Sequence, residues 1–367
     1  MSSLIDIFVN KRQKICKEEK SDSSDVPESD SDDFAEDSED EKKMYRPGGY
    51  FNAEGRNILK DNKKNIWKIK EKIGRGHFST VYACVDKDNN EYALKIQKSA
   101  KSYRTAAREE IMIHEYLNKS NVKGKDNVCL MLNNFCQHVS NAKHFCMIFP
   151  KLNCDLNQFA NTYDNCMISL DTTSKIAHDV LNGLSFIHNT GFLHSDLKPE
   201  NILVDKEKDA FLISDLGTAS VIGDREFSYI QTGHYRSPEI ILQHRKWNEK
   251  IDIWSLACIM FECITGSYLF KGENDEDYIL SFIETVGIPN YIFLDNCKSK
   301  REYFNREYRY KNSADLSPLS IDRKLQEKYG FDRKTAISIY TLLQPMLIWD
   351  IDTRWSADEM LTLYNRM

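Results

Sequence analysis

The sequence lacks the features that mark membrane proteins, secreted proteins and zinc or disulfide scaffolds. No run of about 18 apolar residues occurs, since the most apolar segment, IWSLACIMF, ends at Glu262, and no signal-like apolar stretch opens the chain. The ten cysteines include no C-x-x-C pair and no His/Cys cluster at metal spacing, which predicts reduced core thiols. We therefore expect a soluble intracellular protein, in the cytoplasm, the nucleus or both, with no membrane partner.

Acidic charge is concentrated in one segment. The net charge of the 367 residues is −6, but residues 1–43 alone hold seven Lys/Arg and fourteen Asp/Glu. This serine-rich segment has almost nothing to bury, so residues 1–44 are predicted to form a disordered acidic tail. The rest of the chain is close to neutral and has no basic stripe, which argues against direct binding of nucleic acid.

The periodicity of the remaining chain divides it into two halves. Residues 66–97 alternate apolar and polar positions between turn signals, as in an antiparallel meander. A helical segment at 104–118 and a strand at 143–150 follow, and helical spacing then dominates at 172–189, 252–265, 276–286 and 334–347. This order predicts an α+β, bilobal fold with a small β-rich N-lobe and a larger α-helical C-lobe.

The segment IGRGHFSTV has glycines at the spacing of a phosphate-binding loop. Gly74 and Gly76 would let a hairpin backbone approach phosphates, and Ser79 takes the third glycine position of G-x-G-x-x-G-x-V. A tight hairpin without a ligand would leave the same pattern. The candidate nucleotide-binding residues here are Ile73, Gly74, Arg75, Gly76, His77, Phe78, Ser79, Thr80 and Val81.

Downstream of this loop, the segment YALKI places Lys95 in the middle of an apolar strand. An unpaired buried ammonium group is costly, so this position requires a phosphate and a carboxylate partner. On the helix that follows, we choose Glu110 over Glu109 as that partner. The alternative is a surface lysine on the strand and a surface glutamate on the helix.

The segment GFLHSDLKPENIL carries a second set of polar residues. Asp196 can accept a hydroxyl proton, while Lys198 would screen charge on a transferring phosphoryl group. Asn201, and Asp215 in ISDLGTA, offer hard oxygen ligands for Mg²⁺. Leu216 stands where Phe is usual after that aspartate, which changes packing but keeps the metal ligand. Along the chain, the motifs occur in the order that is typical of enzymes that transfer a phosphoryl group from ATP.

Together these motifs resemble the eukaryotic protein kinases, over residues 66 to about 363. The resemblance implies ATP and Mg²⁺ as cofactors, a protein substrate and serine/threonine specificity. It also implies a buried ion pair between Glu239 and Arg354. Asp252 corresponds to a brace for the catalytic loop, and Thr232 to a loop threonine near the catalytic aspartate.

The same resemblance gives a hinge and domain boundaries. Pro150 has no N–H but keeps the carbonyl that the hinge offers to adenine, and Leu152 would supply the N–H. We place an N-terminal extension at 45–65, the N-lobe at 66–149, the hinge at 150–152 and the C-lobe at 153–367.

A narrower resemblance is to the SR-protein kinases. It rests on the segments YRPGGY, GRGHFSTVY, KSAKSY, DLGTAS, IQTGHYRSPE and GSYLF, and covers Tyr45 to the C-terminus. It implies phosphorylation of Arg-Ser-rich splicing factors, and hence a role in mRNA splicing regulation. Two features depart from that family. Ser267 stands where a docking Asp is usual, and the long spacer insert is missing between Asn201 and Asp215.

Two acidic residues are candidates for docking such a basic substrate. Asp277 and Glu284 lie in GENDEDYILSFIETV at a spacing that puts them on one helix face. In the related kinases these positions belong to an acidic groove that holds Arg-rich peptide. The alternative is an acidic helix start that is only solvated and favoured by the helix dipole.

Ser195 replaces the Arg of the His-Arg-Asp motif, which normally pairs with a phosphate on the activation loop. A serine has no charge and cannot form the paired hydrogen bonds that an arginine forms with a phosphate. The SR-protein kinases carry a small hydroxyl residue at this position and are active. We therefore hypothesise a constitutively active, monomeric Ser/Thr kinase. The alternatives are a kinase of the same wider group with another substrate class, and a pseudokinase adaptor that acts by binding alone.

Overall fold

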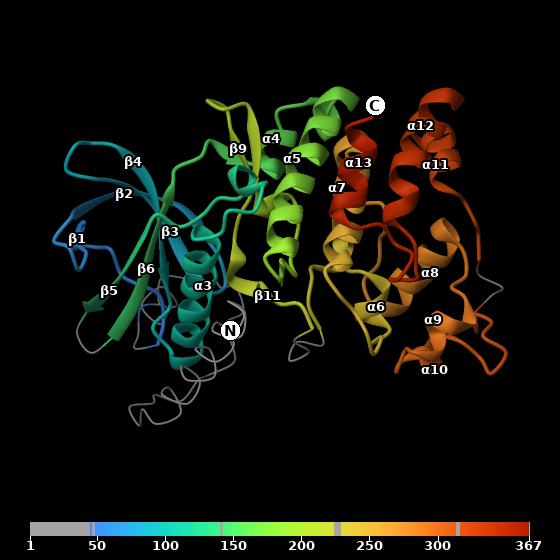
Figure 1. Ribbon diagram of the computed structural model, residues 1–367, viewed down its shortest axis with the longest axis horizontal. Coiled ribbons are helices and arrows are strands. Elements are labelled where there is room, and N and C mark those ends of the chain that lie inside the picture. The colour runs from blue at the N-terminus through green and yellow to red at the C-terminus, as the bar shows by residue number, and fades with distance from the viewer. Residues whose placement is uncertain (1–44, 46–47, 140–141, 224–228, 313–315, 367) are drawn as a thin grey trace. The chain divides into compact units, whose positions relative to one another are not determined.

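The computed structural model describes residues 45, 48–139, 142–223, 229–312 and 316–366, so the acidic tail predicted for residues 1–44 lies outside the described residues. The described chain forms two compact units. Of the described residues, unit 1 contains those up to Ser120, those within Cys129–Leu152 and Asp215–Gly217, and unit 2 contains Asn121–Val128, Asn153–Ser214 and those from Thr218 onward. The fold is α+β as predicted, with the large sheet in unit 1 and most helices in unit 2 (Figure 1).

Unit 1 is built around an antiparallel sheet of six strands in the order β1-β2-β3-β4-β6-β5. Every neighbouring pair runs antiparallel, as expected for a meander. Strand β1 pairs with β2, although it lies in the segment that we placed before the N-lobe. The bounds are β1 Ile58–Lys60, β2 Ile66–Arg75, β3 Ser79–Val85, β4 Glu91–Gln97, β5 Asn133–Val139 and β6 Ala142–Pro150.

Alternation along the strands determines which face of the sheet is buried. In β2, Trp67 and Ile69 are buried while the residue between them is exposed. They pack in one apolar cluster with Phe51, Leu59 and Leu94. The segment before β1 therefore contributes to the core of unit 1 through Phe51.

Helix α3 (Lys101–Asn118) covers the sheet with a buried stripe at helical spacing. Ala107 and Ile111 pack against a second apolar cluster that includes Phe145. Glu110 lies in the buried stripe, whereas Glu109 falls outside it. The helix register thus turns Glu110, and not its neighbour, toward the sheet.

In unit 2, the central helix is α7 (Lys250–Thr265), in which nearly every residue is buried. The helices predicted at 172–189 and 276–286 are present as α5 (Leu170–Asn189) and α8 (Asp275–Val286). The helix predicted at 334–347 ends earlier, as α12 (Arg333–Leu343), because a proline that cannot donate an N–H follows in a 3-10 turn. None of the helices in the described residues is both apolar enough and long enough to span a membrane.

The other elements of unit 2 are short. The helices are α4 Leu156–Ala160, α6 Pro238–Ile241, α9 Tyr291–Asp295, α10 Lys300–Tyr303, α11 Ile321–Tyr329 and α13 Ala357–Tyr364. Strands β7 Cys154–Asp155, β9 Ile202–Asp205 and β10 Ala210–Ile213 form one small sheet, and β8 Phe192–Leu193 pairs with β11 Ser220–Val221. These small sheets flank the segments that carry Asp196 and Asn201.

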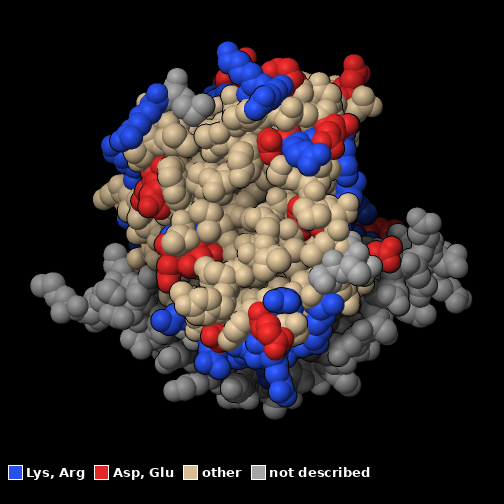
Figure 2. All heavy atoms as spheres, turned by 90° about the vertical axis from the view of Figure 1, so that its right-hand side faces the viewer, with Lys and Arg blue, Asp and Glu red and all other residues tan. Residues whose placement is uncertain are grey.

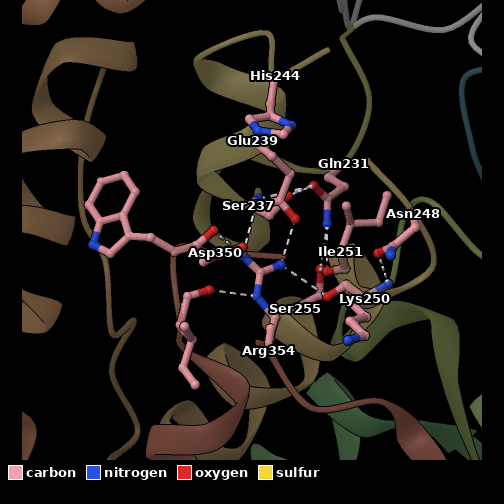
Figure 3. Close-up of polar contacts among 12 residues, drawn as sticks. Gln231, Ser237, Glu239, His244, Asn248, Lys250, Ile251, Ser255, Asp350 and Arg354 are labelled. Atoms are coloured by element: carbon pink, nitrogen blue, oxygen red, sulfur yellow. Dashed lines mark hydrogen bonds and ion pairs between the residues drawn. The ribbon is translucent and has the colours of Figure 1, made fainter. Parts of the chain in front are cut away.

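A fully buried ion pair anchors helix α6. Glu239 and Arg354 are both 0% exposed, and the Arg354 guanidinium donates to both carboxylate oxygens, at 2.5 and 2.9 Å (Figure 3). Its remaining N–H groups reach the carbonyl oxygens of Ile348, Lys250 and Trp349. The ion pair implied by the resemblance is therefore present, with an acceptor for every guanidinium N–H.

Replacing Arg354 with Ala is expected to lower the free energy of unfolding by about 3–5 kcal/mol, because the Glu239 carboxylate would stay buried without a counter-charge. Denaturant titration followed by circular dichroism measures the change. Arg323→Ala is the matched control, since Arg323 forms an exposed ion pair with Glu327 at 2.7 Å. That variant should lose no more than about 1 kcal/mol. Equal losses in both variants would contradict the anchoring role.

Candidate active site

The predicted site residues are divided between the two units. The residues expected to bind ATP all lie in unit 1: residues 73–81, Lys95, Glu110, Pro150 and Leu152. The expected catalytic residues Asp196, Lys198 and Asn201, the docking candidates Asp277 and Glu284, and the structural residues Thr232, Glu239, Asp252 and Arg354 all lie in unit 2. Of the two expected metal ligands, Asp215 lies in unit 1 and Asn201 in unit 2.

Lys95 on β4 holds its ammonium group between two carboxylates. Its Nζ atom lies 2.7 Å from Glu110 Oε1 and 2.8 Å from Asp215 Oδ1. Glu110 is 1% exposed, and its other carboxylate oxygen accepts a hydrogen bond from Gln97 at 3.3 Å. The structure thus brings Lys95 to the glutamate that we chose from the sequence, and adds Asp215 to the pair.

The three charges stabilise one another against burial. Burial alone would lower the pKa of Lys95, but the carboxylates of Asp215 and Glu110 outweigh it and raise that pKa. For Glu110, burial acts to raise the pKa, whereas the Lys95 charge and the His114 imidazole, whose Nε2 lies 3.9 Å from Glu110 Oε1, lower it below its usual range. The pair therefore keeps both charges at neutral pH and loses the Glu110 charge only in acid.

The hairpin between β2 and β3 leaves open space beside Gly76. A Cβ atom added to Gly76 would meet no atom within 4 Å, and one added to Gly74 would only touch Val81 at 3.7 Å. Neither glycine has a positive φ, so the backbone conformation does not require glycine at either position. Space for an approaching phosphate is a reason for glycine at Gly76. The residues of this loop therefore fit a nucleotide.

Apolar side chains flank this open loop. Ile73 and Phe78 are 44% and 50% exposed, whereas Ser79 and Thr80 are buried at the start of β3. The exposure of Ile73 and Phe78 leaves apolar surface beside the glycine-rich loop, and this surface is available for contact with a ligand.

The predicted hinge follows the last residue of β6. Pro150 ends that strand opposite Tyr92 of β4. A proline at the end of a strand does not interrupt the hydrogen-bond ladder of the strand interior. Leu152 follows outside the sheet and is half-buried.

In unit 2, the Asp196 carboxylate is held in one orientation. The Thr232 hydroxyl donates to Asp196 Oδ1 at 2.7 Å, and Lys198 Nζ lies 2.8 Å from Oδ2. Asn201 Nδ2 donates to the backbone carbonyl of Asp196 at 2.8 Å, which leaves its Oδ1 as the atom suited to a metal. These four side chains therefore meet as the sequence predicts.

A metal ion at this site would need ligands beyond the protein. No three His, Cys, Asp or Glu side chains in the described residues cluster as a self-contained metal site. Mg²⁺ takes only one or two protein oxygens in phosphoryl-transfer sites and completes its shell with phosphate and water. An asparagine and an aspartate of the kind predicted here fit that mode of binding.

Asp252 fixes the backbone next to the catalytic aspartate. Its buried carboxylate accepts hydrogen bonds from the backbone N–H groups of His194 and Ser195, at 2.8 and 3.0 Å. His188 Nε2 lies 2.9 Å from the same carboxylate. Ser195 has a φ of 73°, a region that non-glycine residues adopt infrequently. The two backbone contacts of Asp252 stabilise this conformation.

The Ser195 side chain is buried and uncharged. The residue is 1% exposed, and its hydroxyl has no hydrogen-bond partner in the part of the chain that the structure describes. Unlike an arginine, it has no pair of N–H groups to donate to a phosphate. Phosphorylation of the neighbouring loop would therefore gain no contact from this position.

Sequence reasoning did not single out Gln231, which lies at the centre of a buried network (Figure 3). Its Nε2 donates to Ser255 Oγ at 2.9 Å and to the Ile251 carbonyl at 3.1 Å. Its Oε1 accepts from the backbone N–H and the hydroxyl of Ser237, both at 3.0 Å. No local pattern in IQTGHYRSPE marks this glutamine, because its partners on α7 are 20 and 24 positions away.

The two candidate docking residues lie on α8, but each carboxylate accepts a backbone hydrogen bond. Asp277 Oδ2 accepts from the N–H of Glu273 at 2.9 Å, and Glu284 Oε1 from the N–H of Ser317 at 2.8 Å. The face seen in Figure 2 mixes acidic and basic side chains around an uncharged centre, and its described residues show no continuous acidic surface. Both carboxylates therefore have structural roles of their own.

Comparison with known proteins identifies one domain and several relatives. Residues 67–363 match the protein kinase domain. A serine/threonine-protein kinase SRPK from Physarum polycephalum is 31% identical over 89% of this chain and 91% of its own length. The dual specificity tyrosine-phosphorylation-regulated kinase 3 is 34% identical in Mus musculus and 33% identical in Homo sapiens, over 70% of this chain in each case. The chain spans 44% of the length of these two proteins.

Gly76→Val is expected to weaken the binding of Mg²⁺·ATP at least about tenfold, which corresponds to roughly 1.4 kcal/mol. The valine side chain would fill the space that we assign to phosphate, and its Cβ atom would meet no atom within 4 Å. Isothermal titration with Mg²⁺·ATP measures the affinity, and the melting temperature serves as the control for folding. A folded variant with unchanged affinity would contradict the assignment of the loop.

Proposed function

Because the chain belongs to the protein kinase family and is a protein serine/threonine kinase, we propose that it phosphorylates serines of Arg-Ser-rich proteins and so regulates mRNA splicing. The observation that carries this proposal is the similarity to the Physarum SRPK, which extends over 89% of this chain and 91% of that protein. The SR-kinase-like segments, from YRPGGY to GSYLF, support the same substrate class.

Within this proposal each polar residue has a role in the transfer. Asp196 accepts the proton of the substrate hydroxyl, in the orientation that Thr232 and Lys198 impose on its carboxylate. Lys198 also screens charge on the transferring group. Asn201 and Asp215 are the residues that would hold Mg²⁺, which would supply positive charge to neutralise the phosphates.

The nucleotide is bound by the residues of unit 1. The backbone around Gly76 approaches the phosphates, and Lys95 reaches them from its site between Glu110 and Asp215. Pro150 and Leu152 offer a carbonyl and an N–H to adenine. The buried Glu110 keeps the lysine charged and in place.

A second candidate is a kinase of the same wider group with another substrate class. The carboxylates of Asp277 and Glu284 already accept backbone hydrogen bonds, which weakens the case for a guanidinium-binding groove. Ser267 also stands where the SR-protein kinases have a docking Asp. The similarity to a dual specificity tyrosine-phosphorylation-regulated kinase supports this alternative.

We further propose that the enzyme is active without phosphorylation of its activation loop, the segment from Gly217 to Ser237. Arg236, at the end of this loop, donates to the Tyr229 hydroxyl and to the carbonyls of Ile230 and Gln231, at 2.7, 3.0 and 2.7 Å. Its guanidinium also stacks over the Tyr229 ring at 4.0 Å. With the Gln231 network, these contacts hold the described end of the loop without any phosphate. A buried Ser195 fits this arrangement, since it needs no phosphate partner.

The substrate class is tested by phosphate transfer from Mg²⁺·ATP to an Arg-Ser repeat peptide, a Pro-directed peptide and a generic serine peptide. The wild-type protein is expected to phosphorylate the Arg-Ser peptide alone, and Asp196→Asn to lower kcat by about 10²–10⁴-fold, because it removes the general base. Asp209→Asn is the control, since that aspartate is 89% exposed. Transfer to the Pro-directed peptide instead would support the second candidate. No transfer to any peptide would support the adaptor.

The loop network is tested by Gln231→Asn, which keeps a residue tolerant of the φ of 67° but shortens the side chain. The variant is expected to lose roughly fivefold to thirtyfold in kcat, corresponding to one or two kcal/mol of loop order. Gln243→Asn is the matched control, because Gln243 is exposed and has a φ of 51°. If both variants keep wild-type kcat on the same peptide, the network does not order the loop.

A further inference from the structure

A short strap precedes the sheet of unit 1 and is pinned to the junction of β4 and α3. In this strap, residues 48–51, the N–H of Gly48 donates to the Ser99 hydroxyl at 3.0 Å. The Gly48 and Gly49 carbonyls accept from the N–H groups of Ala100 and Ser99, at 2.9 and 3.0 Å. Phe51 is 1% exposed and lies in the apolar core. The strap is therefore a fixed part of unit 1.

Tyr50, between these anchors, reaches the tip of the glycine-rich loop. Its hydroxyl lies 2.8 Å from the Gly76 carbonyl oxygen and 3.3 Å from that of His77. The guanidinium of Arg75 lies 4.2 Å from the centroid of the Tyr50 ring. One side chain thus contacts three successive residues of the loop.

Lys98 links this tyrosine to the other side of the loop. It is only 2% exposed, and its Nζ lies 4.5 Å from the Tyr50 ring centroid and 5.0 Å from that of Tyr103. An ammonium group between two aromatic faces is stabilised by their quadrupoles. The backbone N–H of Lys98 also donates to the Phe78 carbonyl at 2.9 Å. Lys98 therefore contacts both tyrosine rings through its ammonium group and the loop through its backbone N–H.

Tyr103, at the start of α3, contacts two side chains of the loop, those of His77 and Phe78. Its hydroxyl lies 3.4 Å from His77 Nε2. Its ring meets the rings of His77 and Phe78 edge-to-face, with centroids 6.2 and 5.8 Å apart. We name Tyr50, Lys98 and Tyr103 the loop clamp. They contact the tip from the strap, from the residue that follows β4 and from helix α3.

We propose that the loop clamp orders the glycine-rich loop before the nucleotide binds, with Tyr50 as the positioning residue. The inference rests on the assignment of residues 73–81 as the ATP phosphate loop. A flexible loop must lose conformational entropy when it closes on a ligand. A loop that is already ordered loses less, so the nucleotide binds more tightly.

The clamp also sets the direction of the backbone donors. Tyr50 holds the carbonyls of Gly76 and His77 on the strap side. Because the peptide unit is planar and trans, the N–H of His77 then points away from the strap, and so does the N–H of Phe78. Backbone N–H groups aligned in one direction are the donors that a phosphate requires. The hydroxyl of Tyr50 therefore orients the backbone N–H groups toward a phosphate without contacting the phosphate itself.

Tyr50→Phe removes one hydroxyl and keeps the ring that packs on Lys98 and Arg75. The variant is expected to raise the Kd and the KM for Mg²⁺·ATP by about threefold to tenfold, the effect of one lost hydrogen bond. The KM for the peptide substrate and the melting temperature should stay at wild-type values. Amide hydrogen exchange of residues 74–79 in the nucleotide-free protein should become faster.

Tyr92→Phe is the matched control. It also removes a tyrosine hydroxyl from the sheet of unit 1, since Tyr92 donates to Asp86 at 3.2 Å, but neither residue contacts the strap or the loop tip in the contacts described above. The control is expected to bind Mg²⁺·ATP as the wild type does. Equal losses in the two variants, or unchanged or tighter binding by Tyr50→Phe, would overturn the proposal.

Gly76→Val separates failure of the clamp from failure of the loop assignment. If Gly76→Val weakens Mg²⁺·ATP binding and Tyr50→Phe does not, the loop binds the nucleotide but the clamp does not position it. If neither variant changes binding to a protein that does bind ATP, the assignment of residues 73–81 is wrong and the clamp proposal is overturned with it.

Discussion

A buried charge in this protein is stable only where other groups compensate it, and that constraint positions Lys95 in unit 1 and the catalytic loop in unit 2. Lys95 is buried between Glu110 and Asp215, which ties the central strand of unit 1 to its helix and to the start of the activation loop. In unit 2, Asp252 is compensated by backbone N–H groups and thereby shapes the catalytic loop. Removing one partner in such a pair leaves an uncompensated charge, which is strongly destabilising.

Contacts within the chain, and not a phosphate, hold the described end of the activation loop. Ser195 is buried and offers no cation, while Gln231 donates to the Ile251 carbonyl of α7 and Arg236 donates to the Gln231 carbonyl. Hydrogen bonds of this kind depend on geometry and not on a covalent modification. Under the proposal that the enzyme is active without phosphorylation of this loop, control of the enzyme acts elsewhere.

The sequence allowed the prediction of those features that depend on local spacing. The apolar strand around Lys95 predicted a carboxylate partner on the next helix, and Glu110 is that partner. The kinase motifs placed Asp196, Lys198 and Asn201 in one short segment, where they meet. The fold class followed from the change from strand to helix spacing.

Contacts between distant segments were not predictable in the same way. Tyr50 and Gly76 are 26 positions apart, and Gln231 and Ser255 are 24 apart, so neither pair leaves a local pattern. The backbone bond of Glu284 was missed for the same reason, since its partner Ser317 is 33 positions away. The pairing of β1 with β2 and the bond between Asp277 and Glu273 are local, and were also missed.

The most direct test of the account is the initial rate of phosphatase-treated protein on the Arg-Ser peptide, with the intact mass of the enzyme followed during turnover. The account predicts a full rate without a lag while the enzyme mass stays unchanged. A lag that ends as the enzyme gains phosphate would contradict it.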